Sequence, residues 1–126
     1  MVLLVEASPA VRLPLAESLS GDGLAVIEAT SGLEALHKAR TFKPHIVITD
    51  LYLPDLDGLS LSRALRAQEF IRDVPLIGLV GRMTALAPLR VAGFSVILRK
   101  PCSSRLLLER VRGLLDREPS GGAVCR

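Results

Sequence analysis

Short apolar runs rich in β-branched residues alternate with helical segments along the chain, and this alternation constrains the fold more than any other feature. The runs lie at residues 2–6, 24–28, 45–49, 75–80 and 95–98. Apolar residues at helical spacing predict helices between the runs and after the last one. Because the connections are short, successive strands must be parallel and joined by right-handed crossovers. The pattern predicts an α/β protein with five strands and five helices.

Cap residues and helix breakers place the first two helices. Ser8 followed by Pro9 predicts a helix start, and Pro14 is expected to kink or shorten it. Ser31 and Glu34 have the spacing of a capping box for the second helix.

The later helices have weaker or ambiguous ends. Asp57 is expected to cap a third helix that extends to about Arg72. A short fourth helix is predicted over residues 83–92. Ser103 or Ser104 is expected to cap the last helix, whose apolar side carries leucines and a valine.

The chain has 126 residues, which suits one domain. We expect that domain to cover residues 1–117, followed over residues 118–126 by a flexible tail or the start of a linker. Hydrophobic residues make up 49% of the chain, yet no apolar run reaches the roughly 18 residues that span a membrane. The apolar excess is explained by strands that are buried on both faces.

Cysteine content indicates the redox compartment of the chain, and the distribution of charge indicates the kind of partner it could bind. Two cysteines, Cys102 and Cys125, form no disulfide framework, so free thiols in a reducing cytoplasm are expected. Residues 1–73 carry a net charge of −3 and residues 74–126 one of +6. The basic half could meet an acidic protein surface, with a solvated arginine-rich face as the alternative. Aromatic residues are only 3% of the chain, which argues against nucleic-acid binding by this domain.

Charged residues follow three of the predicted strands. Glu6 ends the first, Asp50 ends the third and Lys100 follows the fifth. Ligands of open α/β sheets bind beyond the carboxyl ends of the strands. If these three strands are neighbours, the side chains converge into a site where Asp50 is a nucleophile and Glu6 a metal ligand. Taken singly, Glu6 could be a solvated strand end and Lys100 a salt-bridge partner of Asp50.

The loop after Asp50 contains two more acids, which alone are ordinary turn and cap residues. These are Asp55 and Asp57.

Over about residues 1–117 the chain resembles the receiver domains of two-component response regulators. The matching segments are Leu4-Val5-Glu6, Asp50 with Leu53-Pro54-Asp55-Leu56-Asp57-Gly58, Pro75-Leu76-Ile77, Gly93, and Leu98-Arg99-Lys100-Pro101. The resemblance implies a flavodoxin-like, doubly wound parallel sheet of strand order 2-1-3-4-5 with five helices. It implies a phosphorelay role, with Asp50 accepting a phosphoryl group from a phosphohistidine on a sensor histidine kinase. Mg²⁺ would be held by Glu6, Asp50 and the backbone carbonyl of Tyr52, and Lys100 would pair with the phosphoryl oxygens.

Three positions depart from the family pattern. Ala7 stands where a second acid usually completes the Mg²⁺ site, and a methyl group cannot ligate. Val80 replaces a threonine or serine hydroxyl, and Ile97 replaces an aromatic switch residue. The sequence therefore predicts an atypical receiver domain with weakened Mg²⁺ binding and switching.

Alternatives remain open. The same fold could serve as a phosphorylation-independent interaction module, a pseudo-receiver. Either form is expected to bind a signalling protein or a second copy of itself through the face of the fourth helix, fifth strand and fifth helix. Candidate arginines on that face are Arg90, Arg99, Arg105, Arg110 and Arg112.

An enzyme is a third reading, and we expect none. A phosphatase with an aspartate nucleophile needs a second acid where Tyr52 stands. An FMN protein needs a glycine-rich phosphate loop where Ala7-Ser8-Pro9 stands.

Overall fold

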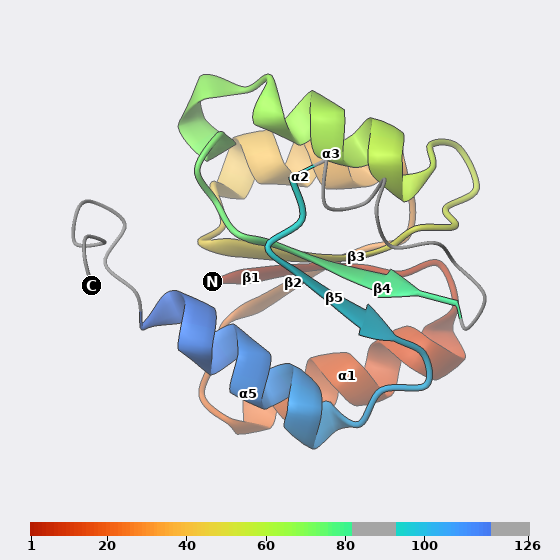
Figure 1. Cartoon of the computed structure of the whole chain (residues 1–126), viewed down its shortest axis with the longest axis vertical. Helices are drawn as coiled ribbons and strands as arrows, with labels where there is room; N and C mark the ends of the chain where they lie inside the picture. The colour runs from red at the N-terminus through yellow and green to blue at the C-terminus, as the bar shows by residue number, and fades with distance from the viewer. Residues whose placement is uncertain (82–92, 117–126) are drawn as a thin grey trace.

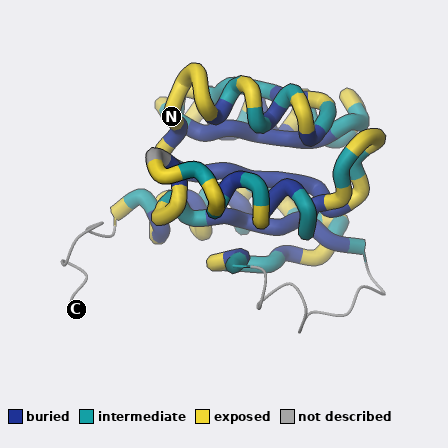
Figure 2. The backbone as a smooth tube through the Cα atoms, turned by 90° about the horizontal axis from the view of Figure 1, so that it is seen from above, coloured by how far each residue is buried: buried dark blue, intermediate teal, exposed yellow. Residues whose placement is uncertain are grey.

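Five parallel strands form one sheet in the order β2-β1-β3-β4-β5. The computed structural model describes residues 1–81 and 93–116. The strands are β1 (Val2–Val5), β2 (Val26–Ala29), β3 (Ile46–Asp50), β4 (Leu76–Val80) and β5 (Val96–Arg99). Every residue of β1, β3 and β4 is buried, which confirms that apolar strands are covered on both faces. Figure 2 shows dark, buried strands behind helices whose turns are partly exposed.

Helices cover both faces of the sheet. Helix α1 (Pro9–Gly21) and helix α5 (Ser104–Leu115) lie side by side on one face, and α2 (Gly32–Phe42) and α3 (Gly58–Arg66) lie on the other (Figure 1). The predicted strand order and α/β class are confirmed. The described residues contain these four α-helices; the fourth helix predicted over residues 83–92 lies outside them, as does the tail predicted for residues 118–126.

Each face has its own apolar cluster, because successive strand residues point to opposite sides. Leu3 and Val47 belong to the cluster under α2 and α3, whereas Leu4 and Ile48 belong to the cluster under α1 and α5. A fully buried leucine or isoleucine stabilises the fold by about 1.5–3 kcal/mol. The two clusters pack the helices against both faces of the sheet. Because all five strands are parallel, their carboxyl ends lie along one edge of the sheet.

Two helix predictions need correction. The third helix ends at Arg66 rather than near Arg72, and a 3-10 turn, η1 (Glu69–Ile71), follows. This turn brings Ile71 into the core, where its exposure is 0%. Pro14 does not delay the start of α1, which begins at Pro9 and continues through it.

Candidate functional site

Glu6 and Asp50 lie side by side at the carboxyl edge of the sheet. Strands β1 and β3 are neighbours, and Val5 is opposite Thr49 in their parallel register. The residues that follow, Glu6 and Asp50, therefore occupy adjacent positions. Both are buried, with exposures of 2% and 5%.

Lys100 reaches these two acids from farther away than the sequence argument supposed. Strand β4 lies between β3 and β5, so the first, third and fifth strands are not all neighbours. The Lys100 amide donates to the Val80 carbonyl at 2.7 Å, which places Lys100 beside the end of β4. Its long side chain crosses that strand end, so convergence at the site does not require β5 to adjoin β3.

The Lys100 ammonium bridges both carboxylates. Nζ lies 3.0 Å from Asp50 Oδ2 and 3.1 Å from Glu6 Oε1. Burial alone would lower the pKa of Lys100, but its hydrogen bonds to Asp50 and Glu6 outweigh that effect and raise the pKa above its ordinary value. One cation thus serves two buried acids, which leaves the cluster with a formal charge of −1 when all three groups are ionised.

The four carboxylate oxygens differ in their partners. Glu6 Oε2 accepts a hydrogen bond from the Ser8 amide at 3.1 Å, so both Glu6 oxygens are engaged. Among the buried side-chain nitrogen and oxygen atoms of the described residues, Asp50 Oδ1 is without a hydrogen-bond partner. The hydroxyl of buried Thr49 donates to the Asp50 carbonyl at 2.8 Å. Asp50 is therefore held firmly and keeps one oxygen available for chemistry.

The donor set fits a divalent cation only in part. Asp50 Oδ1 is a free buried carboxylate oxygen of the kind that Mg²⁺ binds. Ala7 contributes no side-chain oxygen, and the Glu6 oxygens already accept from Lys100 and Ser8. Across residues 1–81 and 93–116, no group of three or more His, Cys, Asp and Glu side chains is arranged to hold a metal ion.

Two of the three departures from the family pattern, Val80 and Ile97, lie in apolar surroundings. Val80, at the end of β4, is fully buried, and Ile97 on β5 packs against the same cluster. Their side chains fill the core and offer no polar group to the site. Ala7 is half-buried in the connection between β1 and α1.

Sequence reasoning underestimated two residues near the site. Arg12 on α1 donates from Nη1 to the Glu6 carbonyl at 2.9 Å and pairs with Glu28 at 2.9 Å, which ties the loop after β1 to β2. Asp55 is more than a turn residue, because its carboxylate accepts hydrogen bonds from the first amides of α2. A glycine at the start of α2, opposite an acid-containing loop, is the one sequence signal for this contact.

The predicted N-cap residues of α1, α3 and α5 differ in whether their side chains form a cap hydrogen bond. Asp57 caps α3 as predicted by accepting from the Ser60 amide at 2.7 Å, which lowers the pKa of Asp57. The hydroxyl of Ser103, the N-cap of α5, accepts from the Leu106 amide. Ser8 occupies the N-cap position of α1, but its side chain makes no cap hydrogen bond.

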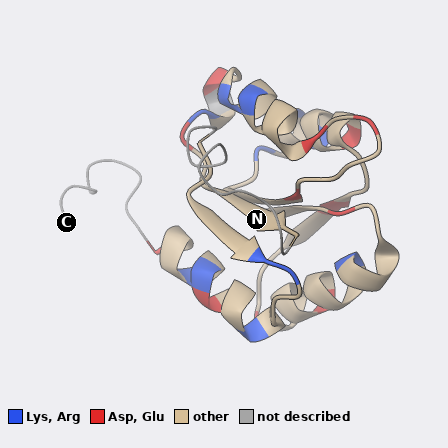
Figure 3. Ribbon diagram, turned by 45° about the vertical axis from the view of Figure 1, so that its right-hand side comes forward, with Lys and Arg blue, Asp and Glu red and all other residues tan. Residues whose placement is uncertain are grey.

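The predicted arginine face is only partly described. Arg99 donates to the Gly81 carbonyl at 3.2 Å, Arg105 lies 3.9 Å from Glu109, and Arg110 is exposed. Arg112 pairs with Asp22 at 2.8 Å, at the end of α1, so it faces α1 rather than β5. Arg90 lies outside the described residues. In the ribbon of Figure 3, basic residues, coloured blue, lie along α5 and at the end of β5.

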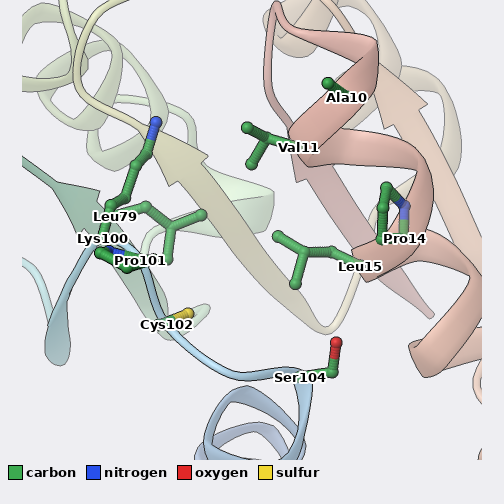
Figure 4. Close-up of a pocket in the computed structure, with 9 residues that line it drawn as sticks. All are labelled: Ala10, Val11, Pro14, Leu15, Leu79, Lys100, Pro101, Cys102 and Ser104. Carbon is green, nitrogen blue, oxygen red and sulfur yellow. The ribbon is translucent and has the colours of Figure 1, made fainter.

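An apolar pocket of about 450 Å³ adjoins the Lys100 stem (Figure 4). It lies between α1, which contributes Val11 and Leu15, and the segment from Lys100 to Ser104. Cys102 on its wall is a free thiol, and burial raises the pKa of that thiol. A raised pKa favours the protonated thiol over the more reactive thiolate.

None of the helices in the described part of the chain is long and apolar enough to span a membrane.

The family model and the curated relatives that match this chain all belong to response regulators. The family model of the response regulator receiver domain matches residues 2–112. A curated relative, response regulator MprA of Mycolicibacterium vanbaalenii, is 38% identical over 127 residues; the match covers 97% of this chain and 53% of MprA. The chain thus spans about half the length of the curated relatives it matches.

Solved structures that resemble this chain are also receiver domains or response regulators. The receiver domain of sensor histidine kinase PA1611 from Pseudomonas aeruginosa PAO1, with a magnesium ion coordinated in its active-site cleft, has a TM-score of 0.83 and 30% identity, covering 90% of this chain and 95% of that one. The chemotaxis response regulator CheY4 of Vibrio cholerae has a TM-score of 0.84 and 27% identity, covering 90% and 96%. With the edge cluster of Glu6, Asp50 and Lys100 in place, the chain belongs to the response regulator receiver domain family of two-component signalling.

Proposed function

We propose that this receiver domain accepts a phosphoryl group on Asp50 slowly, because its cation site is weakened. The observation that carries the proposal is the bridging contact of Lys100 with Asp50 and Glu6, which leaves Asp50 Oδ1 as the free oxygen. A cluster built to balance buried charge suits phosphoryl transfer, which depends mainly on positioning and charge neutralisation.

The donor in this proposal is a phosphohistidine on a sensor histidine kinase. Asp50 Oδ1 forms the new bond to phosphorus, and the histidine nitrogen leaves with the bond's electron pair. The product is an acyl phosphate, and Lys100 Nζ, 3.0 Å from Asp50 Oδ2, is close enough to pair with the incoming phosphoryl oxygens. The domain needs no turnover of its own to act as such a switch, and we assign it none.

Mg²⁺ is the cation that the family implies, and Asp50, Glu6 and the Tyr52 carbonyl would hold it. When bound, it neutralises charge on the transferred group. We expect weak binding, because Ala7 supplies no carboxylate and a Glu6 oxygen would have to exchange Lys100 or the Ser8 amide for the ion.

The readout of phosphorylation is also expected to be reduced. A hydroxyl at the end of β4 and a ring on β5 are the usual sensing groups of the family, and Val80 and Ile97 pack in the core instead. That packing favours the second candidate function, a phosphorylation-independent binding module. In either case the expected partner is a signalling protein or a second copy of the chain, bound through the face that includes Arg99, Arg105 and Arg110.

Incubation with acetyl phosphate and Mg²⁺, followed by intact mass measurement, tests the proposal. We expect the wild-type chain to gain one phosphoryl group slowly and Asp50→Asn to gain none. Ala7→Asp restores the missing carboxylate, and we expect it to tighten Mg²⁺ binding about tenfold, equivalent to about 1.4 kcal/mol, and to speed labelling. Ala7→Asn is the matched uncharged control. No adduct on either the wild-type chain or Ala7→Asp at saturating Mg²⁺ would favour the binding module.

A further inference from the structure

The loop that follows Asp50 is closed at its base. The Gly58 amide donates to the Leu51 carbonyl at 2.8 Å, so the two ends of residues 51–58 meet. A Cβ on Gly58 would lie 2.7 Å from Leu51 Cα and 3.2 Å from the Asp50 carbonyl oxygen. The base therefore tolerates no side chain at position 58 without displacing the backbone beside Asp50.

The tip of the same loop is fastened to α2. Asp55 Oδ1 accepts from the Gly32 amide at 2.7 Å, and Oδ2 accepts from the Leu33 amide at 2.9 Å. Leu56 packs directly on Gly32, where a Cβ would lie 2.7 Å from Leu56 Cβ. A carboxylate is well suited to this place, because the start of a helix presents free amides and positive potential.

Asp55 differs from the residues that cap α2 from within its own segment. The Ser31 hydroxyl accepts from the Glu34 amide at 3.1 Å, and Glu34 accepts from the Thr30 amide at 2.7 Å. Those bonds stabilise the helix start but do not involve the loop. The Asp55 bonds span more than 20 residues of sequence, and together with the packing of Leu56 on Gly32 they join the loop to α2.

Between the closed base and the fastened tip, Tyr52, Leu53 and Pro54 have little freedom. We propose that Asp55 is a positioning residue of the Asp50 site, fixing the backbone of residues 52–54 and with it the direction of the Tyr52 carbonyl. The inference rests on the proposed function in one respect, since that carbonyl is one of the oxygens expected to hold Mg²⁺. In this proposal α2 also helps to position the site, because its first amides bind the Asp55 carboxylate.

The chain offers a direct probe, because Tyr52 is its single tyrosine. Protein prepared with tyrosine carrying ¹³C at the carbonyl carbon gives one labelled carbonyl signal, that of Tyr52. The experiment compares the wild-type chain, Asp55→Ala, Asp55→Asn and the control Ser31→Ala, first in EDTA and then in an MgCl₂ titration. Ser31→Ala weakens the same helix start without touching the loop.

In EDTA we expect Asp55→Ala to shift and broaden the Tyr52 carbonyl signal, Asp55→Asn to do so less, and Ser31→Ala to leave it at the wild-type position. In the titration we expect Asp55→Ala to weaken Mg²⁺ binding about tenfold, the usual effect of losing a group that orients a ligand. An unchanged signal in Asp55→Ala, or an equal change in Ser31→Ala, would overturn the assignment.

The two proposals fail separately. If the wild-type chain accepts no phosphoryl group but the EDTA contrast between Asp55→Ala and Ser31→Ala holds, the positioning role stands and the phospho-acceptor function falls. If the wild-type chain is phosphorylated and the contrast is absent, the function stands and Asp55 is only a helix cap.

Discussion

Two sets of three residues lie at or near the carboxyl edge of the sheet, and they differ in the chemical groups that they supply. Glu6, Asp50 and Lys100 form a contacting charged cluster, with Nζ to oxygen distances of 3.0 and 3.1 Å. The second set, Ala7, Val80 and Ile97, is apolar, and two of its members belong to the core packing. The charged set would supply an acceptor and the apolar set would supply neither metal ligand nor sensor. Under the proposed function, the charged set accepts the phosphoryl group, while the groups that would report phosphorylation are replaced by apolar side chains.

The largest expected effect comes from removing the cation of the charged set. Lys100→Met leaves two adjacent buried carboxylates without a cation, and we expect the free energy of unfolding to fall by about 3 kcal/mol. Urea denaturation at pH 7 measures it. Adding Glu6→Gln to this variant removes one of the two charges and should recover part of the loss. A loss below about 1 kcal/mol, as for an exposed pair, would mean that the cluster is not electrostatically buried.

A smaller effect is expected from adding a polar group to the apolar set. Val80→Thr buries a hydroxyl at a position with 0% exposure, so we expect a loss of about 1–2 kcal/mol in the free protein. Val47→Thr, in the same cluster, is the matched control. A beryllium–fluoride phosphoryl mimic should restore stability only to Val80→Thr, whose hydroxyl lies at the site. Equal stabilisation of both variants would show that position 80 does not sense the phosphoryl group.

The smallest effect is expected from the Glu34–Lys38 ion pair, whose acid is more exposed than the buried acids of the charged set. The Thr30 amide, together with Lys38, lowers the pKa of Glu34 from 4.5 to about 2. Ionised Glu34 therefore contributes stability above pH 4.5, and that contribution is lost as the pH falls from 4.5 towards 2. We expect Glu34→Gln to cost about 0.5 kcal/mol at pH 7, because solvent screens the pair, and clearly less at pH 2, where much of the Glu34 carboxyl is protonated. Unfolding curves at both pH values measure this; a pH-independent cost would contradict the assignment.

The sequence was sufficient for the strands and for the charged set. β-Branched runs that end in Glu6 and Asp50 indicate both the strand and the edge where its side chain emerges. The site could be predicted because parallel strands present their carboxyl ends together. Asp57 as a cap followed from local spacing alone, and the structure confirms it.

Long-range contacts were beyond the sequence argument. The bonds of Asp55 to Gly32 and Leu33 depend on how the loop after β3 folds against α2, which no local spacing encodes. The early end of α3 has a similar origin, since burial of Ile71 overrides a helical pattern that continues past Arg66. Lys100 contacts Glu6 and Asp50 although β4 lies between β3 and β5, because its side chain is long enough to reach them.

The pairing of α1 with α5 has a consequence for how the chain is completed. The cluster beneath these helices joins Leu19 of α1 to Val111 and Leu114 of α5, so one face of the sheet is closed by residues from opposite ends of the domain (Figure 1). During synthesis, α2 and α3 can cover their face before the last strand exists. The other face can be covered only in part by α1 until α5 leaves the ribosome, because Leu107, Val111 and Leu114 complete its cluster with Leu4, Ile46 and Ile48. A chain stopped before residue 104 would carry a partly uncovered apolar sheet face, and we expect it to bind chaperones.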